Sequence, residues 1–153
     1  MTKLSLARLT GSCTLLIVLL AACSHEDPNS PVYKRKQVFK EMLRTSQSMR
    51  DMLKGAKAWD AQAFRSNADK LQQLAQQPWP LFVPPDQNDH SKTDAKASIW
   101  SHPQDFHAAQ DKLLDNVTRL KDVAATGDAD KIRPQFSAME DSCSACHKAF
   151  REF

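Results

Sequence analysis

The feature that most constrains this chain is a five-residue run close to its C-terminal end. Residues 143–147 read Cys-Ser-Ala-Cys-His. In a helix, positions i, i+3 and i+4 lie on one face, so Cys143, Cys146 and His147 share a face. Two thiols at this spacing match the two vinyl groups of one porphyrin, and the adjacent imidazole provides a ligand for its iron. We interpret the run as the attachment site of one covalent haem c, with His147 as an axial ligand.

A Cys-x-x-Cys pair also occurs in thiol redox sites and in zinc sites. A thioredoxin-like redox site requires strands that alternate with helices, and this chain has no run with strand periodicity. A tetrahedral zinc site requires two more nitrogen or sulfur ligands at a comparable spacing, and the candidates here are scattered. Haem attachment is preferred on condition that the chain is exported, because haem c is attached outside the cytoplasm.

The first 22 residues are predicted to be a cleaved leader and no part of the fold. Their apolar run at residues 15–20 is too short to span a bilayer as a helix. It leads into Leu-Ala-Ala-Cys at residues 20–23, which resembles the lipobox of bacterial lipoproteins, where the cysteine becomes a lipidated N-terminus. We therefore expect a lipid anchor at Cys23, with simple periplasmic secretion or an uncleaved anchor as alternatives. Ser24 favours the outer membrane over the inner one.

This assignment accounts for all four cysteines of the chain. Cys13 leaves with the leader, Cys23 carries lipid, and the remaining two bind haem, so we expect no structural disulfide. The formal net charge of +3 includes two basic residues of the leader. The rest of the chain is therefore close to neutral, and nothing favours a nucleic-acid partner.

Residues 23–31 are polar and contain two prolines, which predicts a short tether. Residues 32–153 contain four stretches with apolar side chains at helical spacing and no strand pattern. We expect an all-α domain, an antiparallel up-down-up-down four-helix bundle with a long loop between helices 2 and 3. The helices are predicted from about Val32 to Lys54, from Asp60 to before Pro78, from near Pro103 to Gly127, and from Asp128 or Asp130 onward.

The predicted loop covers residues 78–102, because four prolines between positions 78 and 85 exclude a helix there. Its middle is polar and is expected to be exposed. In the fourth helix, Pro134 is tolerable only near the first turn. His102 and His107 are expected at the surface or as caps. Apolar residues at both ends of the loop are expected to pack on the bundle: Trp79, Leu81, Phe82, Val83, Ile99 and Trp100.

The second axial side of the iron decides the function. A methionine or histidine there gives a low-spin electron-transfer haem, whereas an open position binds a small molecule. We expect the first helix to cover this side, with Arg35, Phe39 and Met42 on one stripe. Phe39 has no ligating atom, and a methionine at helical spacing is typical of a core. The favoured interpretation is a five-coordinate, high-spin haem that binds NO or CO or transfers electrons.

The alternative is a low-spin, six-coordinate electron-transfer cytochrome with Met42 as its sixth ligand. A haem-free helical lipoprotein is a third possibility. The sequence shows no acid–base constellation, so we do not expect an enzyme, and it identifies no redox partner.

These features resemble the class II cytochrome c family, specifically the cytochromes c′, over residues 32–153. The resemblance implies that His147 is the proximal iron ligand and that Phe39 takes the distal position, where the low-spin branch has methionine. It also implies homodimers formed through the first two helices. The residues that carry it are Arg35, Phe39, Met42, Pro78, Trp79, Phe82, the run Ala-Lys-Ala-Ser-Ile-Trp at 95–100, Gly127, Asp128, Cys143, Cys146, His147 and Arg151.

The resemblance also implies roles for four charged residues. Arg35, with Lys36 beside it, corresponds to the family arginine near the haem propionates. Asp94 lies where the family often has a contact on the propionate side. Arg151, four residues after His147, corresponds to the arginine on the proximal side. From spacing alone, Arg35 and Arg151 are equally compatible with a solvated helix face.

Overall fold

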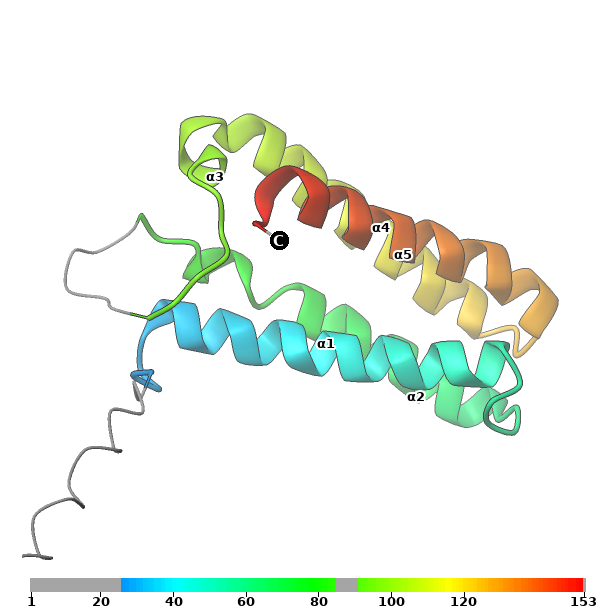
Figure 1. The fold of residues 1–153 in the computed structure, drawn as a ribbon. Coiled ribbons are helices and arrows are strands. Elements are labelled where there is room, and N and C mark those ends of the chain that lie inside the picture. Colours follow the sequence, from blue (N-terminus) through cyan, green and yellow to red (C-terminus); the bar gives the residue numbers. More distant parts are fainter. Residues whose placement is uncertain (1–25, 85–90, 153) are drawn as a thin grey trace, which may run out of the picture.

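The computed structural model describes residues 26–84 and 91–152 of the chain. Four long helices run up and down as an antiparallel bundle, which confirms the predicted fold class (Figure 1). Among the described residues there is no strand, and Ala95 and Arg151 form an isolated bridge. The elements are α1 (Pro31–Leu53), α2 (Ala61–Ala75), the 3-10 helix η1 (Trp79–Leu81), α3 (Ser98–Ser101), α4 (Pro103–Ala124) and α5 (Ala129–Phe150).

The predicted leader, including Cys13, and the predicted lipid attachment site at Cys23 lie outside the described residues. Within the described part of the chain, none of the helices has the length and apolar character needed to cross a membrane.

Local chemistry sets the helix ends close to where the sequence placed them. The Asp60 carboxylate caps α2 by accepting the Gln62 and Ala63 amides at 3.0 and 2.9 Å. Asp128 caps α5 in the same way. Gly127, between α4 and α5, has a φ of 68°, a conformation that a side chain disfavours. Ser30 caps α1, which therefore begins at Pro31, one residue earlier than expected.

The main core runs along the inner faces of the four long helices. Met42 is 6% exposed within it, as expected for a methionine that fills a core. A second, smaller cluster of Ile99, Phe106 and Phe150 closes the end of the bundle near the C-terminus. The fully enclosed side chains of the main core include Met49, Phe64, Leu71, Val117, Leu120, Ile132 and Met139.

The connection between α2 and α4 differs from the predicted irregular loop. It contains η1 and α3, because Trp79 and Ile99 anchor short turns against the bundle ends. Val83, expected to pack, is 46% exposed. Pro134 also lies deeper than expected: α5 begins at Ala129, so Pro134 falls in the second turn, inside the helix. The packing of α5 on the core outweighs the missing amide of this proline.

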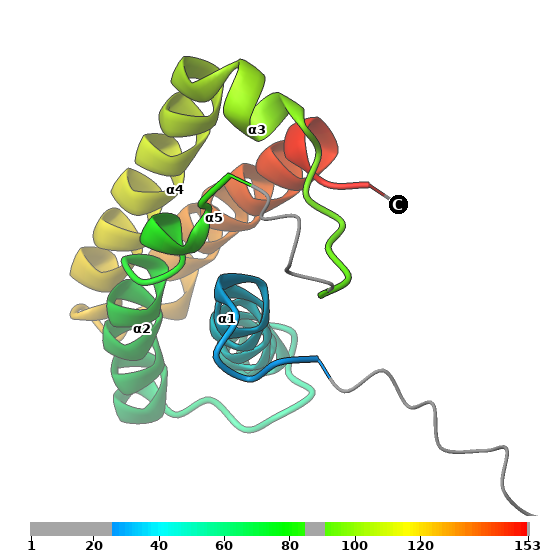
Figure 2. The same cartoon turned by 90° about the vertical axis from the view of Figure 1, so that its left-hand side faces the viewer.

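Helices α1 and α5 meet at one end of the bundle only. At that end, Arg50 Nε donates to Glu140 Oε1 at 2.7 Å, and the Arg133 guanidinium donates to the Leu53 carbonyl. Toward the opposite end the two helices lie apart in both views (Figures 1 and 2). That end holds the N-terminus of α1, the C-terminus of α5 and, crossing between them, the segment that follows residue 90.

Candidate functional site

The two thiols of the Cys-x-x-Cys-His run lie half-buried on the inner side of α5 and are not joined to each other. Cys143 packs on the main core, with its Sγ 3.7 Å from the Met139 Sδ, and Cys146 packs on the smaller cluster. Burial raises the pKa of the Cys143 thiol to about 11 and also raises the pKa of Cys146. Both thiols are therefore protonated at neutral pH.

His147 lies on the side of α5 that faces α1. Residues seven apart in a helix share a stripe, and Arg133, Glu140 and His147 have this spacing. The first two contact α1, and His147 follows two turns later, where the helices have separated. Partial burial, and then the charge of Arg151, lower the pKa of His147. The imidazole is thereby favoured in the neutral form that ligates iron.

Phe39 lies on the matching stripe of α1. It precedes Arg50 by eleven residues, about three turns, so both side chains lie on one face. Measured from the contact between Arg50 and Glu140, Phe39 is about 16 Å and His147 about 10 Å along the bundle axis. The two residues therefore oppose each other across the separated helices, within about two turns. Leu43 lies on the same stripe, is 59% exposed, and was not among the predicted site residues.

Aromatic rings close the wall beside Phe39. Its ring meets those of Trp79 and Phe82 edge to face, at centroid distances of 6.3 and 6.2 Å. Phe106 joins this pair to Phe150 at the end of α5. The indole N–H of Trp79 donates to the Ala75 carbonyl, so this donor is already engaged within its own segment.

Arg35 is a buried member of the same wall, 4% exposed, and not part of a solvated helix face. Its guanidinium donates to the Leu81 carbonyl at 3.0 Å and to Thr93 Oγ1 at 2.8 Å, and lies 4.7 Å from the Phe82 ring centroid. This contact geometry combines charge-assisted hydrogen bonds with a cation–π interaction. Arg35 therefore joins α1 to two separate parts of the connection between α2 and α4, at Leu81 and at Thr93.

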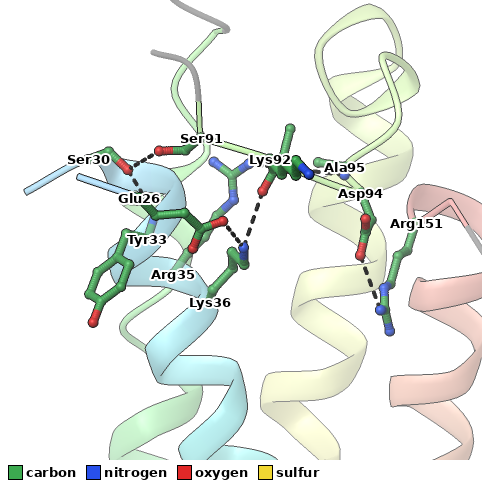
Figure 3. A network of polar contacts seen from close by, with 11 residues as sticks. Glu26, Ser30, Tyr33, Arg35, Lys36, Ser91, Lys92, Asp94, Ala95 and Arg151 are labelled. Atoms are coloured by element: carbon green, nitrogen blue, oxygen red, sulfur yellow. Dashed lines mark hydrogen bonds and ion pairs between the residues drawn. The ribbon is translucent and has the colours of Figure 1, made fainter. Parts of the chain in front are cut away.

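Lys36, the next residue, reaches the surface beside this wall. Its ammonium pairs with the Glu26 carboxylate and donates to the Lys92 carbonyl at 3.2 Å (Figure 3). Glu26 belongs to the predicted tether, so the last residues of that segment contact the bundle. Glu26 is thus held at the end of the bundle where α1 and α5 lie apart.

Asp94 and Arg151, which the resemblance places on different sides of the haem, form an ion pair at 3.2 Å (Figure 3). Backbone hydrogen bonds surround the pair: the Lys96 amide donates to the Phe150 carbonyl at 2.9 Å, and the Glu152 amide donates to the Asp94 carbonyl at 2.7 Å. Both side chains of the pair are more than half exposed, so its own free energy is small. Its structural effect is to join the segment after residue 90 to the end of α5.

A pocket of about 500 Å³ also borders Cys146, on the opposite side of α5 from α1. It lies between α3, α4 and α5, and its polar lining comes from Ser98, His102, Asp105, Lys112 and Ser142. His147 does not contribute to it. His102 and His107 are both exposed, as predicted, and His102 is the N-cap residue of α4.

The arrangement fits a flat apolar cofactor that is bound through two thiols and one imidazole. The thiols are unpaired, His147 faces the separation between α1 and α5, and the opposite wall is aromatic. In contrast, nowhere in residues 26–84 and 91–152 do three His, Cys, Asp or Glu side chains converge as ligands for a metal ion. Fold and site together define a four-helix protein of the haem c class.

Comparison with known proteins identifies the family. The family model described as cytochrome c′ matches residues 30–151. Cytochrome c′ from Alcaligenes xylosoxydans xylosoxydans is 32% identical over 125 residues, covering 82% of this chain and 95% of that protein. Cytochrome c′ from Rubrivivax gelatinosus is 27% identical over 127 residues, covering 83% and 98%. The chain belongs to the cytochrome c′ family, whose cofactor is covalently bound haem c.

Solved structures agree with this assignment. A ferrous variant of cytochrome c′ from Alcaligenes xylosoxidans with bound NO superimposes with a TM-score of 0.74 at 30% identity, covering 82% of this chain and 98% of that chain. A carbon monoxide-bound variant of the same protein gives a TM-score of 0.74 at 32% identity, covering 82% and 97%. Variants of one family member that resembles this chain thus carry NO or CO in their structures.

Proposed function

We propose that this chain is a gas-binding haem protein whose haem is five-coordinate and high-spin, and which takes up NO or CO. The observation that carries the proposal is the placement of Phe39 on the stripe of α1 that opposes His147. Phe39 has no atom that ligates iron, and its neighbours Trp79 and Phe82 present aromatic rings. Met42, the ligand of the alternative proposal, is directed into the core and is 6% exposed.

Different residues of the chain have different roles around the cofactor. Cys143 and Cys146 would form the thioethers, and neutral His147 would hold the iron, which supplies the site for a diatomic gas. Phe39 and its aromatic neighbours exclude water from the other side and offer no hydrogen-bond donor. Such a wall disfavours bound O₂, whose separated charge requires a donor, more than it disfavours NO or CO. We place Arg35, Lys36 and Asp94 on the propionate side, and Arg151 on the proximal side.

The absorption spectrum of the ferrous, haem-loaded protein tests this function. We expect a high-spin, five-coordinate spectrum that changes when NO is added. A low-spin spectrum with a sulfur–iron charge-transfer band would contradict the proposal and support the Met42 alternative. Haem staining after denaturing electrophoresis provides the control for covalent attachment, because only a covalently held haem remains with the chain.

We further propose that Cys23 carries the lipid anchor and places the domain on the periplasmic side of the outer membrane. The Leu-Ala-Ala-Cys run at residues 20–23 supports this. Glu26, three residues after this cysteine in the sequence, pairs with Lys36 of α1. Membrane fractionation tests the anchor: Cys23→Ser should move the protein from the membrane to the soluble fraction, and an unchanged distribution would exclude lipidation at this residue.

We also propose a homodimer formed through α1 and α2, as the resemblance to cytochromes c′ implies. Sedimentation analysis of the haem-loaded domain tests it, and a monomer at micromolar concentration would refute it. Catalysis is not part of the proposal. Electron transfer is compatible with the same site, and its partner would be a redox protein or small donor outside the chain.

A further inference from the structure

Residues 91–96 form a strap across the end of the bundle where α1 and α5 lie apart. On the α1 side, the Ser91 hydroxyl meets that of Ser30 at 2.9 Å, and the Lys92 carbonyl accepts from Lys36 (Figure 3). On the α5 side, the backbone of the strap bonds to residues 150 and 152. One short segment is therefore in contact with both helices that flank the cofactor site.

Thr93 and Asp94 stand at the centre of the strap and bind opposite helices. Thr93 Oγ1 accepts from Arg35 of α1 at 2.8 Å, and the Asp94 carboxylate accepts from Arg151, just after α5, at 3.2 Å. In an extended chain, successive side chains point to opposite sides. Because Thr93 and Asp94 are adjacent, one of them can accept a hydrogen bond from α1 while the other accepts one from the end of α5.

Each of these bonds ends next to a residue of the haem site. Arg35 lies over the Phe82 ring, and Phe82 contacts Phe39, so the bond from Thr93 supports the wall on the distal side. The Arg151 amide donates to the His147 carbonyl at 2.9 Å, so the bond from Asp94 supports the turn of α5 that carries the axial ligand. The contacts of Arg50 and Arg133 between α1 and α5 lie toward the other end of the bundle and cannot replace this support.

We propose that Thr93 and Asp94 are positioning residues, which hold α1 and α5 together across the open end and thereby limit the access of gas to the iron. This inference rests on the proposed gas-binding function. If the strap detaches transiently and gas enters only while it is detached, the rate of gas association is proportional to the fraction of molecules in which the strap is detached. Removing one hydrogen bond to a charged group raises that fraction by up to about tenfold.

The test compares variants of the haem-loaded protein. Thr93→Val removes the acceptor for Arg35, Thr93→Ser keeps it, and Asp94→Asn removes the charge that pairs with Arg151. All three are surface changes, because both residues are exposed, so the fold is retained. Thr118→Val and Asp111→Asn are matched controls, since they make the same changes at exposed positions of α4.

Two quantities are measured for each variant: the rate of CO association with the ferrous protein, and the hydrogen exchange of the Lys96 and Glu152 amides, which form the strap's backbone bonds to the end of α5. In Thr93→Val we expect both to rise by up to about tenfold. In Asp94→Asn we expect a smaller rise, of up to about fivefold, because the Asp94–Arg151 pair is exposed. The double variant should exceed either single variant. Thr93→Ser and the two controls should match the unmodified protein.

Unchanged amide exchange would overturn the proposal, because the side chains would not then secure the strap. Faster exchange with an unchanged CO rate would overturn it as well, because a released strap would not govern access. The unmodified protein distinguishes the proposed function from this inference: if it binds neither CO nor NO, gas binding itself fails, whatever the variants do.

Discussion

Replacing Phe39 by methionine tests the position that the bundle gives to this residue. Phe39 opposes His147 from the facing stripe of α1, and the flexible thioether of methionine is a haem ligand. We therefore expect Phe39→Met to convert the haem from five-coordinate high-spin to six-coordinate low-spin. Phe39→Leu is the matched control, because leucine is similar in volume and polarity and has no ligating atom.

The contacts of Phe39 also set how much either substitution lowers the free energy of unfolding. The Phe39 ring makes two edge-to-face contacts, with Trp79 and Phe82, and such pairs contribute about 0.5–1.5 kcal/mol each. Both variants lose these contacts, so each should be destabilised by about 1–3 kcal/mol. Phe39→Met should recover part of this loss through the bond to iron, and should therefore be more stable than Phe39→Leu when haem is attached.

Absorption and electron paramagnetic resonance spectra report the spin state, and urea unfolding reports the free energy difference. CO association gives a third measurement: it should be slower in Phe39→Met, where the thioether must leave the iron, and faster in Phe39→Leu, where the wall is smaller. If Phe39→Met stays high-spin and binds CO as fast as Phe39→Leu, residue 39 does not lie over the iron, and α1 and α5 have a different register from the one inferred.

Three further predictions concern stability and reactivity. In the haem-free chain, iodoacetamide should modify Cys143 slowly at pH 8 and faster as the pH rises through about 11, and mass spectrometry measures this rate. Because the folded state raises the pKa of the Cys143 thiol, the protonated thiol's contribution to stability is present below pH 9 and is lost toward pH 11. Pro134→Ala should raise the free energy of urea unfolding, by up to about 3 kcal/mol, because proline in the second turn of α5 provides no amide; a decrease would show that the ring's packing matters more. Asp60→Ala should lower the free energy of urea unfolding by about 1 kcal/mol through loss of the α2 cap, whereas Asp60→Asn should have little effect.

Much of the fold follows from local sequence. The apolar periodicity of the four long helices appears directly as buried stripes, and Asp60 and Asp128 cap α2 and α5 close to the predicted helix starts. These features depend on hydrogen bonds and packing between residues a few positions apart, which a sequence pattern displays. The 3-10 turn at Trp79 and the short helix α3 were missed, because proline-rich stretches suppress the helical pattern although tertiary packing stabilises short turns there.

The roles of the charged residues could not be read from spacing. A solvated helix face and a specific site were equally compatible with Arg35, and only the folded chain shows it buried against Phe82. The partners of Arg35 and Arg151 lie 46 to 58 positions away in the sequence. No periodicity connects such residues, because the connection exists only after the bundle has closed.

The sequence by itself therefore determined what is attached and how the chain is divided into helices. The two thiols and the imidazole lie within five residues, and a single helix face is enough to bring them together. Tertiary structure alone decided what faces that cofactor site. The contact between Arg50 and Glu140, 90 positions apart, sets the register of α1 against α5, and this register places Phe39 opposite His147. The strap around Thr93 and Asp94 then joins the two helices at their open end, because one short segment can contact α1 and α5 together only after the bundle has formed.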